Sequence, residues 1–104
     1  MKVYQLRIES LDMVLEPVFK SRVAASRYKE KYKGRKLLIE ETELETSSER
    51  VYRLSLNESD GYDLLDKIFI SSEAALKYVE NESLTDYQIH EENIISDSNL
   101  SYQI

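Results

Sequence analysis

The chain has 104 residues, 41% of them apolar, and a net charge of −6, so it can form one small domain or two half-domains that share a core. It contains no cysteine, which excludes disulfide bonds, thiolate metal sites and cysteine nucleophiles. A strand pattern begins at the second residue, and no apolar run approaches the roughly 18 residues of a membrane span. We therefore expect an intracellular protein with neither a signal peptide nor a membrane anchor.

The first half of the chain predicts two strands, a helix and a third strand. These elements are expected at residues 2–9, 13–20, 22–33 and 36–45. Pro17 inside the second strand predicts an edge strand or a bulge. Ser21 is a favourable N-cap, and Gly34 is a favourable residue to end the helix.

The second half of the chain predicts the same order of elements. Here they are expected at residues 50–57, 64–70, 73–80 and 86–95. Asp60-Gly61 predicts a tight hairpin turn between the two strands. Ser71 or Ser72 caps the helix, and Asn81 ends it.

An internal repeat connects the two halves. Val3-Tyr4-x-Leu6 returns as Val51-Tyr52-x-Leu54, 48 positions later, and further matches follow at a spacing of 50. A period of this length is typical of a repeated supersecondary unit. The sequence therefore predicts an α+β fold made by tandem duplication of a β-β-α-β module, with antiparallel pairing in the sheet and the helices on one face.

The domain organisation follows from this repeat. The expected units are a first module over residues 1–45, a linker over 46–49, a second module over 50–95 and a polar tail over 96–104. Because the linker is short and polar, we expect the modules side by side, sharing one joint sheet. The tail is expected to be a loose end or an extra edge strand.

The charge is divided unevenly along the chain. Residues 1–39 hold ten Lys/Arg and four Asp/Glu, giving +6, whereas residues 40–104 hold four Lys/Arg and sixteen Asp/Glu, giving −12. Such asymmetry indicates an interaction surface, although charged, solvated faces on an ordinary surface explain it as well.

The acidic half offers the larger candidate surface. Glu41, Glu43 and Glu45 alternate along a predicted strand and so share one face, about 6.7 Å apart. The spacing approximates alternate phosphates of a nucleic acid strand. The full set of candidate partner-binding residues is Glu41, Glu43, Glu45, Glu58, Asp60, Asp63, Asp66, Glu91 and Glu92.

The basic half offers an alternative. Positively charged side chains follow one stripe of the first helix and its C-terminal end, where they could contact phosphates. They are Arg22, Lys29, Lys33, Arg35 and Lys36. The overall acidity of the chain and the lack of a matching stripe on the second helix count against nucleic acid binding.

Catalytic chemistry finds little support. The one histidine, His90, lies opposite Ile89 on a predicted strand, and we expect it to face solvent. Adjacent carboxylates at 40–41 and 91–92 point to opposite faces of their strands, so neither pair chelates a metal. No nucleophile or phosphate-binding motif is present. We expect no catalytic residue, no metal and no cofactor.

The repeated motif carries a resemblance. V-Y-x-L, a strand ending in F-x-S, a helix with A-A-x-x-Y and an acidic third strand together resemble small bacterial and phage proteins with one hairpin-helix-strand module. The matching residues are Val3, Tyr4, Leu6, Phe19, Ser21, Ala24, Ala25 and Tyr28, and Val51, Tyr52, Leu54, Phe69, Ser71, Ala74, Ala75 and Tyr78. They are core and capping residues, so the resemblance implies a fold and no site.

Size and charge also resemble the small proteins with which phages disable host machinery, including DNA mimics, anti-defence proteins and inhibitors. This resemblance implies a cytoplasmic location in a bacterial host cell. The leading hypothesis is an acidic, non-enzymatic inhibitor or modulator, monomeric or homodimeric, that binds a basic surface of a host protein. Nucleic acid binding through the basic helix and self-association as a structural or adaptor protein are the alternatives.

Overall fold

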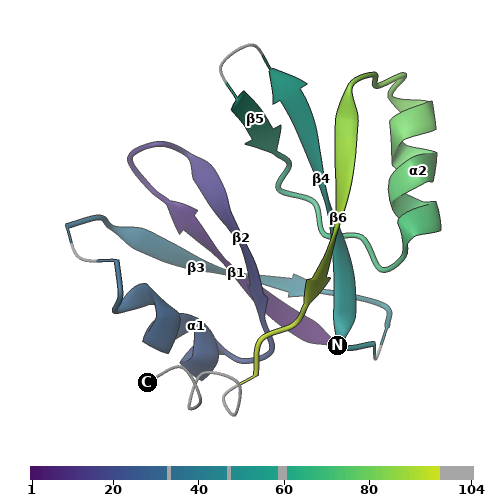
Figure 1. The fold of residues 1–104 in the computed structure, drawn as a ribbon. Helices are drawn as coiled ribbons and strands as arrows, with labels where there is room; N and C mark the ends of the chain where they lie inside the picture. Colours follow the sequence, from purple (N-terminus) through teal and green to yellow (C-terminus); the bar gives the residue numbers. More distant parts are fainter. Residues whose placement is uncertain (33, 47, 59–60, 97–104) are drawn as a thin grey trace.

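The chain folds into two modules of the same element order, each with a three-stranded antiparallel sheet and one helix (Figure 1). The computed structural model describes residues 1–32, 34–46, 48–58 and 61–96. Module one contains β1 (Lys2–Ile8), β2 (Met13–Phe19), α1 (Arg22–Lys29) and β3 (Leu37–Glu43). Module two contains β4 (Arg50–Glu58), β5 (Gly61–Leu64), α2 (Ser72–Asn81) and β6 (Tyr87–Asn93). The α+β class and the β-β-α-β order are confirmed.

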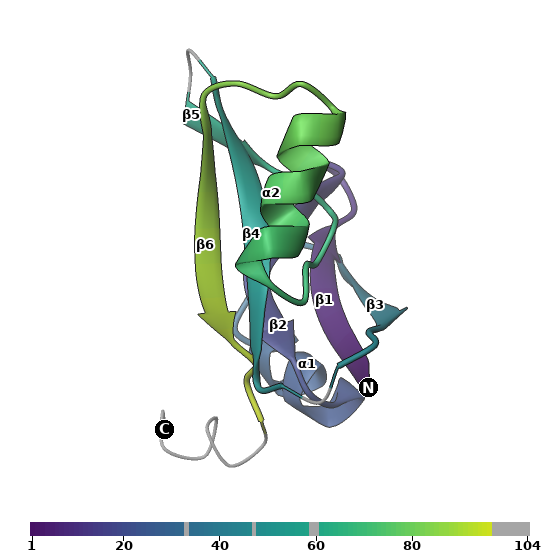
Figure 2. The ribbon, with the colours of Figure 1, turned by 90° about the vertical axis from the view of Figure 1, so that its right-hand side faces the viewer.

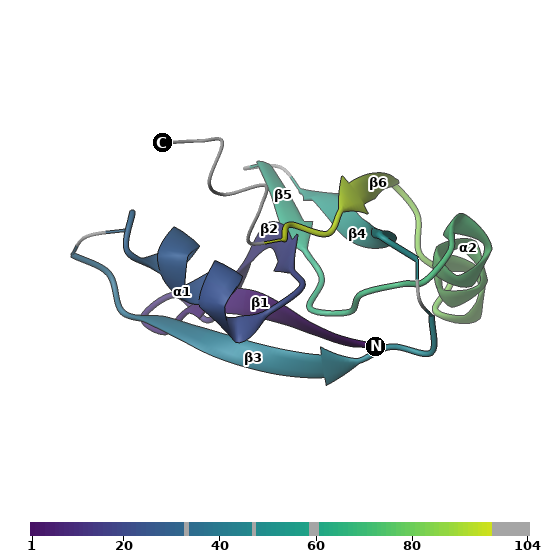
Figure 3. The same ribbon diagram turned by 90° about the horizontal axis from the view of Figure 1, so that it is seen from below.

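The two modules keep separate sheets, so the expected joint sheet is wrong. The strand orders are β2-β1-β3 and β5-β4-β6, with the first strand of each module in the centre. Each helix lies against its own sheet, and the helices lie at opposite ends of the molecule (Figures 1 and 3). The helix-free face of each central strand carries a buried valine, Val3 on β1 and Val51 on β4, and both belong to one apolar cluster between the two sheets.

The modules nevertheless touch through backbone at one corner. Phe19 at the end of β2 forms a parallel bridge with Ile95, just beyond β6. The Lys20 N–H donates to the Ile95 carbonyl, and the Ile95 N–H donates to the Val18 carbonyl, both at 2.8 Å. These bonds join residues that are more than seventy positions apart in the sequence. The tail beyond residue 96 lies outside the described residues, so its expected role is untested.

Local sequence signals place the element boundaries of module one. β2 is an edge strand, and its pairing with β1 shifts register between Gln5 and Arg7, opposite the segment that contains Pro17. Proline lacks the N–H that a regular ladder needs. Ser21 caps α1 by accepting a hydrogen bond from the Ala24 N–H at 3.0 Å. The helix ends earlier than expected, and Gly34, with φ of +84°, lies in the turn that follows.

In module two the return strand is shorter than expected and lies earlier in the chain. The hairpin pairs Glu58 with Gly61, so β5 ends at Leu64, where a strand over 64–70 was predicted to begin. The following residues rejoin β4 at one point, where Tyr52 and Phe69 exchange two backbone hydrogen bonds of 2.8 Å. Ser71 is the N-cap of α2, accepting from Ala74 N–H at 3.0 Å, and the helix ends at Asn81 as predicted.

Three apolar clusters hold the layers together. One lies under α1, where Phe19 packs against Tyr28 with ring centroids 5.1 Å apart. A second lies under α2, which stands in front of β4 in Figure 2. The third joins the helix-free faces of the two sheets and contains Val3, Val18, Leu44, Val51 and Ile94. The modules therefore share a core, as the short length of each half requires.

Candidate functional site

The helix-free faces of the two sheets enclose polar groups as well as the shared apolar cluster. Gln5 follows Val3 on this face of β1, and Arg53 and Ser55 follow Val51 on this face of β4. Gln5 is 5% exposed, and Arg53 and Ser55 are 0% exposed. A buried polar group without a hydrogen-bond partner lowers the stability of the folded state. These three residues are therefore unusual for a buried interface.

Arg53 is the largest fully buried side chain among the described residues. Its Nη2 donates to the Leu65 carbonyl at 3.2 Å. Within the described part of the chain, its Nε and Nη1 have no hydrogen-bond partner. Burial lowers the pKa of the guanidinium, and the carboxylates of Glu92 and Glu16 oppose this shift.

Two of these neighbouring carboxyl groups meet across the interface. Glu16 comes from β2 of module one and Glu92 comes from β6 of module two, and Glu16 contributes to the raised pKa of Glu92. Glu92 pairs with fully buried Val51, so it lies at the margin of the shared apolar cluster. Desolvation and the contact with Glu16 raise the pKa of Glu92 to about 7.

His90 joins the same cluster from β6. It lies opposite Ile89, as predicted, but its face of the strand is covered by module one, so the solvent-facing position expected for it is wrong. Its Nε2 lies 2.8 Å from Ser55 Oγ, and its Nδ1 lies 3.7 Å from Glu16 Oε1. The side chain is 27% exposed.

The order Ser55–His90–Glu16 matches the chemical order of a nucleophile, a base and an orienting carboxylate. A nucleophile must also reach its substrate. Ser55 is completely buried, and neither of the two cavities described below is lined by Ser55 or His90. In this structure Ser55 and His90 share a hydrogen bond inside the interface, and Glu16 lies 3.7 Å from the His90 ring.

A second charged cluster adjoins the first and also joins the modules. Arg7 of β1 binds both oxygens of Glu40 with two bonds of 3.0 Å, and its Nη1 binds Asp12 at 3.1 Å. Its Nη2 binds Asp66 of module two at 2.6 Å. The Gln5 amide donates to the Asp66 carbonyl at 3.3 Å. Hydrogen bonds to Glu40 and Asp66 raise the pKa of Arg7 above its ordinary value.

The acidic residues predicted to form a partner-binding surface are distributed over separate places. Glu41 and Glu43 share one face of β3, as the alternation predicted, because they pair with Tyr4 and Lys2 on one face of β1. Glu45 follows β3 and is exposed. We call Glu41, Glu43 and Glu45 the acidic row. Its charges are partly balanced, since Glu41 lies 3.9 Å from Lys2, and Glu43 lies 3.5 Å from the N-terminal amine.

The remaining acidic residues lie apart from this row. Glu58 and Asp63 are exposed on the β4–β5 hairpin, and Glu91 is exposed on β6, where it binds Arg50 at 3.0 Å. Asp66 is exposed but binds Arg7 of module one, and Glu92 is half-buried on the face of β6 that carries His90 Nε2 to Ser55. Asp60 lies outside the described residues. The eight of these carboxylates that the structure describes thus do not form one continuous face.

The basic residues of the alternative site lie on and after α1. Arg22 and Lys29 are exposed on the helix, and the Arg22 guanidinium lies 5.4 Å from the centre of the Tyr4 ring. Arg35 is exposed beyond the helix, and Lys36 binds Glu9 at 3.2 Å. Lys33 lies outside the described residues. Residues 35 and 36 lie between α1 and β3, after the predicted end of the helix at residue 33.

An open groove of about 510 Å³ lies between the end of β3 and α2. Its walls come from both modules, with Glu43 and Leu44 on one side and Lys77 and Tyr78 of α2 on the other. The connection from β5 to α2 supplies the remaining wall with residues 66–69. Glu43 therefore belongs both to the acidic row and to this groove.

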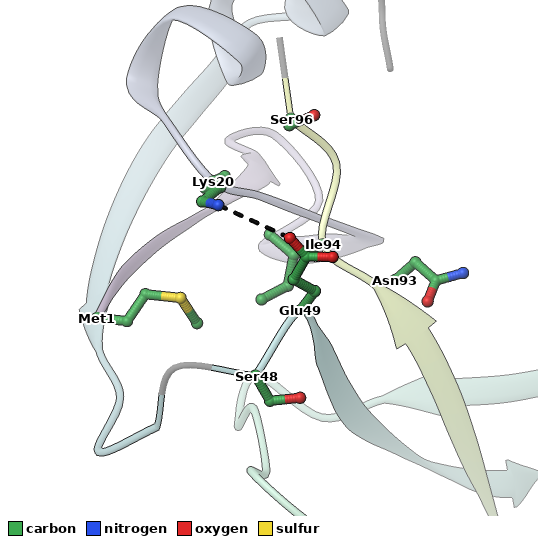
Figure 4. A pocket seen from close by; sticks show the side chains of 7 residues that line it. All are labelled: Met1, Lys20, Ser48, Glu49, Asn93, Ile94 and Ser96. Atoms are coloured by element: carbon green, nitrogen blue, oxygen red, sulfur yellow. Dashed lines mark ion pairs between the residues drawn. The ribbon is translucent and has the colours of Figure 1, made fainter. Parts of the chain in front are cut away.

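A smaller cavity of about 180 Å³ lies where the N-terminus, the linker and the end of β6 meet (Figure 4). Met1, Ile94 and Asn93 line it, and Lys20 and Glu49 face each other across it at 4.0 Å. Both partners of this ion pair are more than half exposed, which makes it a weak interaction.

Two findings for the described residues concern metal binding and membrane insertion. In that part of the chain, no group of three or more His, Asp or Glu side chains is arranged to hold a metal ion. Neither described helix has the length and apolar character needed to cross a lipid bilayer.

Comparison with protein-family models, with curated protein sequences and with solved structures gave no match. The resemblance to small hairpin-helix-strand proteins therefore stays a prediction, and any function rests on the geometry described above.

The sequence-based reasoning missed Glu16, Arg53 and Ser55. Strand alternation puts Arg53 and Ser55 on the face of β4 opposite its apolar residues, and polar residues in this position predict a face exposed to solvent. One sequence feature could have identified them: Val3, Val18 and Val51 lie on the same helix-free faces as these polar residues. A valine at each of these positions indicates that the face is covered.

Proposed function

We propose that this chain is a non-enzymatic protein-binding protein that binds a basic, extended segment of a partner along β3 and into the groove beside it. The observation that carries this proposal is the position of Glu43, which ends the acidic row and also lines the groove of about 510 Å³. β3 is an edge strand, so its outer backbone groups are available to pair with a further strand.

The chemistry of the groove supports an extended peptide. Leu44, Ile68 and Phe69 provide apolar contact, while the exposed carboxylates of the acidic row attract Lys and Arg side chains. Two residues along an extended peptide span about 6.7 Å, which is also the spacing of Glu41 and Glu43 on their shared face. The ion pair of Glu41 with Lys2 joins two exposed side chains, so it exchanges for partner contacts at little cost. Glu43 is also exposed, and it pairs with the amine of the half-buried Met1.

Charge reversal of the acidic row tests this function. The variant E41K/E43K/E45K and the native protein are immobilised and exposed to a nuclease-treated bacterial lysate, and bound proteins are compared by mass spectrometry. We expect a partner of the native protein to be lost from the variant. The matched control is E58K/D63K, which reverses exposed charges on the distant β4–β5 hairpin and should retain the partner.

Circular dichroism establishes that both variants are folded before they are compared. Retention of the same partner by the folded triple variant would contradict the proposal. A bound species that disappears with nuclease treatment would instead favour nucleic acid binding by Arg22 and Lys29, which a gel-shift titration at low salt then tests.

A further inference from the structure

The groove of about 510 Å³ beside β3 is lined by charged side chains of both signs. We propose that Lys67 and Lys77 of this groove bind an acidic side chain of the partner. The partner's segment is then dipolar, with Lys or Arg residues along the acidic row and an Asp or Glu residue in the groove. This inference rests on the proposed function and defines the chemistry of the partner more closely.

The negative charges of the groove already have cationic partners within the protein. Glu43 lies 3.5 Å from the N-terminal amine, and Asp66 binds Arg7 at 2.6 Å. By contrast, no described carboxylate forms an ion pair with Lys67 or Lys77. The groove therefore offers two positive charges to a partner, and an anionic group complements them.

The backbone on both sides of Lys67 is anchored to neighbouring strands. Before it, the Asp66 carbonyl accepts a hydrogen bond from the Gln5 amide of β1 at 3.3 Å. After it, Phe69 exchanges two backbone hydrogen bonds of 2.8 Å with Tyr52 of β4. The wall that carries Lys67 is therefore fixed before a partner arrives, which lowers the entropy lost on binding.

The opposite wall is one stripe of α2. Residues 74, 77, 78 and 81 line the groove, and their spacing is that of a single helical face. Lys77 is exposed on this stripe, and Tyr78 is half-buried. The Lys67 Nζ lies 5.4 Å from the centre of the Tyr78 ring. This contact places the Lys67 ammonium against the wall that also carries Lys77.

The β3 wall and the α2 wall differ in charge. Glu43 lies on the β3 wall, whereas Lys77 lies on the α2 wall. An acidic side chain of the partner is repelled by Glu43 and attracted by Lys77, and the opposite holds for a basic side chain. The basic residues of the segment therefore lie along β3, while its acidic residue points toward α2.

Three synthetic peptides test this inference. Each has capped ends and a core of alternating arginine and valine, followed by a leucine and then by glutamate, glutamine or lysine. Each is also made in the reverse order, because the direction of the partner's chain is open. In fluorescence polarisation at low salt, we expect the native protein to bind the glutamate peptide about fivefold more tightly than the glutamine peptide. The net charge of −6 works against this preference, so overall attraction does not produce it.

Substitutions assign the preference to the two lysines. The double variant Lys67→Gln/Lys77→Gln should bind the glutamate and glutamine peptides equally. Lys77→Glu should reverse the order and favour the lysine peptide. The matched control is Lys29→Gln, which removes an exposed lysine of α1 and should keep the fivefold preference. Circular dichroism establishes that each variant is folded.

The outcomes separate this inference from the proposed function. Equal native affinity for the glutamate and glutamine peptides, with binding of both lost in E41K/E43K/E45K, would overturn the groove assignment and leave the proposed function standing. A preference for glutamate that survives in the double lysine variant would do the same. Tightest native binding of the lysine peptide would assign the groove to a cation on the Tyr78 ring instead. Absence of native binding to every peptide would contradict both proposals.

Discussion

Replacement of Arg53 by methionine is expected to stabilise the protein. The side chain is completely buried, and its one described hydrogen bond is the 3.2 Å contact from Nη2 to the Leu65 carbonyl. Nε and Nη1 have no partner in the described part of the chain. Each unsatisfied buried polar group costs about 1–3 kcal/mol, so the two together cost about 2–6 kcal/mol.

The methionine variant removes this cost and keeps most of the side-chain volume. Two losses oppose this gain. The Leu65 carbonyl loses its hydrogen-bond donor, which costs about 1–3 kcal/mol, and the attraction to Glu16 and Glu92 is lost, which costs on the order of 1 kcal/mol. The expected net change is a stabilisation of about 1 kcal/mol, the difference between the midpoints of these opposing ranges.

Urea unfolding followed by far-UV circular dichroism measures the free energy of unfolding. The native protein and its variants are measured at the same pH. Arg53→Lys is the matched control, because it retains the buried charge and should be less stable than the methionine variant. A methionine variant less stable than the native protein by about 1 kcal/mol or more would refute the reasoning and show that the guanidinium is fully compensated.

Three further changes test the helices and the core. Ser71→Ala removes the N-cap bond to Ala74 and should lower the free energy of unfolding by about 1 kcal/mol in urea titrations; an unchanged value would exclude that role. Phe19→Ala leaves a cavity at a fully buried position and should lower the free energy of unfolding by about 3–5 kcal/mol in the same assay. A decrease below about 1 kcal/mol would mean that the surrounding side chains fill the cavity. Burial and the contact with Tyr32 raise the pKa of Tyr28 to about 12. In an absorbance titration, Tyr28→Phe should therefore remove the tyrosinate step at the highest pH. Ionisation of every tyrosine near about pH 10 in the native protein would contradict this prediction.

Much of the secondary structure was determined by local chemistry that the sequence displays. Serine at positions 21 and 71 caps a helix because its hydroxyl accepts an N–H of the first turn, wherever that helix lies. Pro17 interrupts a ladder because it has no N–H to donate, which is a property of the residue itself. Alternation also placed Glu41 and Glu43 on one face, since strand geometry depends on nothing beyond the strand.

The boundaries that failed depended on competition between segments. β5 ends at Leu64, where the chain leaves the regular ladder although β4 continues to Arg50, and it touches β4 again at Tyr52 before it reaches α2. α1 stops at Lys29 although helix-compatible residues continue. Neither outcome is encoded in the pattern of the segment alone.

The packing of the modules was decided by tertiary structure. The sequence shows polar side chains alternating along β4 and β6, and alternation says which residues share a face but not what covers that face. Stacking of the two helix-free faces buried Arg53 and Ser55, brought Glu16 to 3.7 Å from His90, and placed Asp66 against Arg7. Contacts between residues tens of positions apart depend on how the two sheets pack against each other. The local sequence therefore determines the secondary-structure elements, whereas only the tertiary structure decides which ionisable residues meet at the interface.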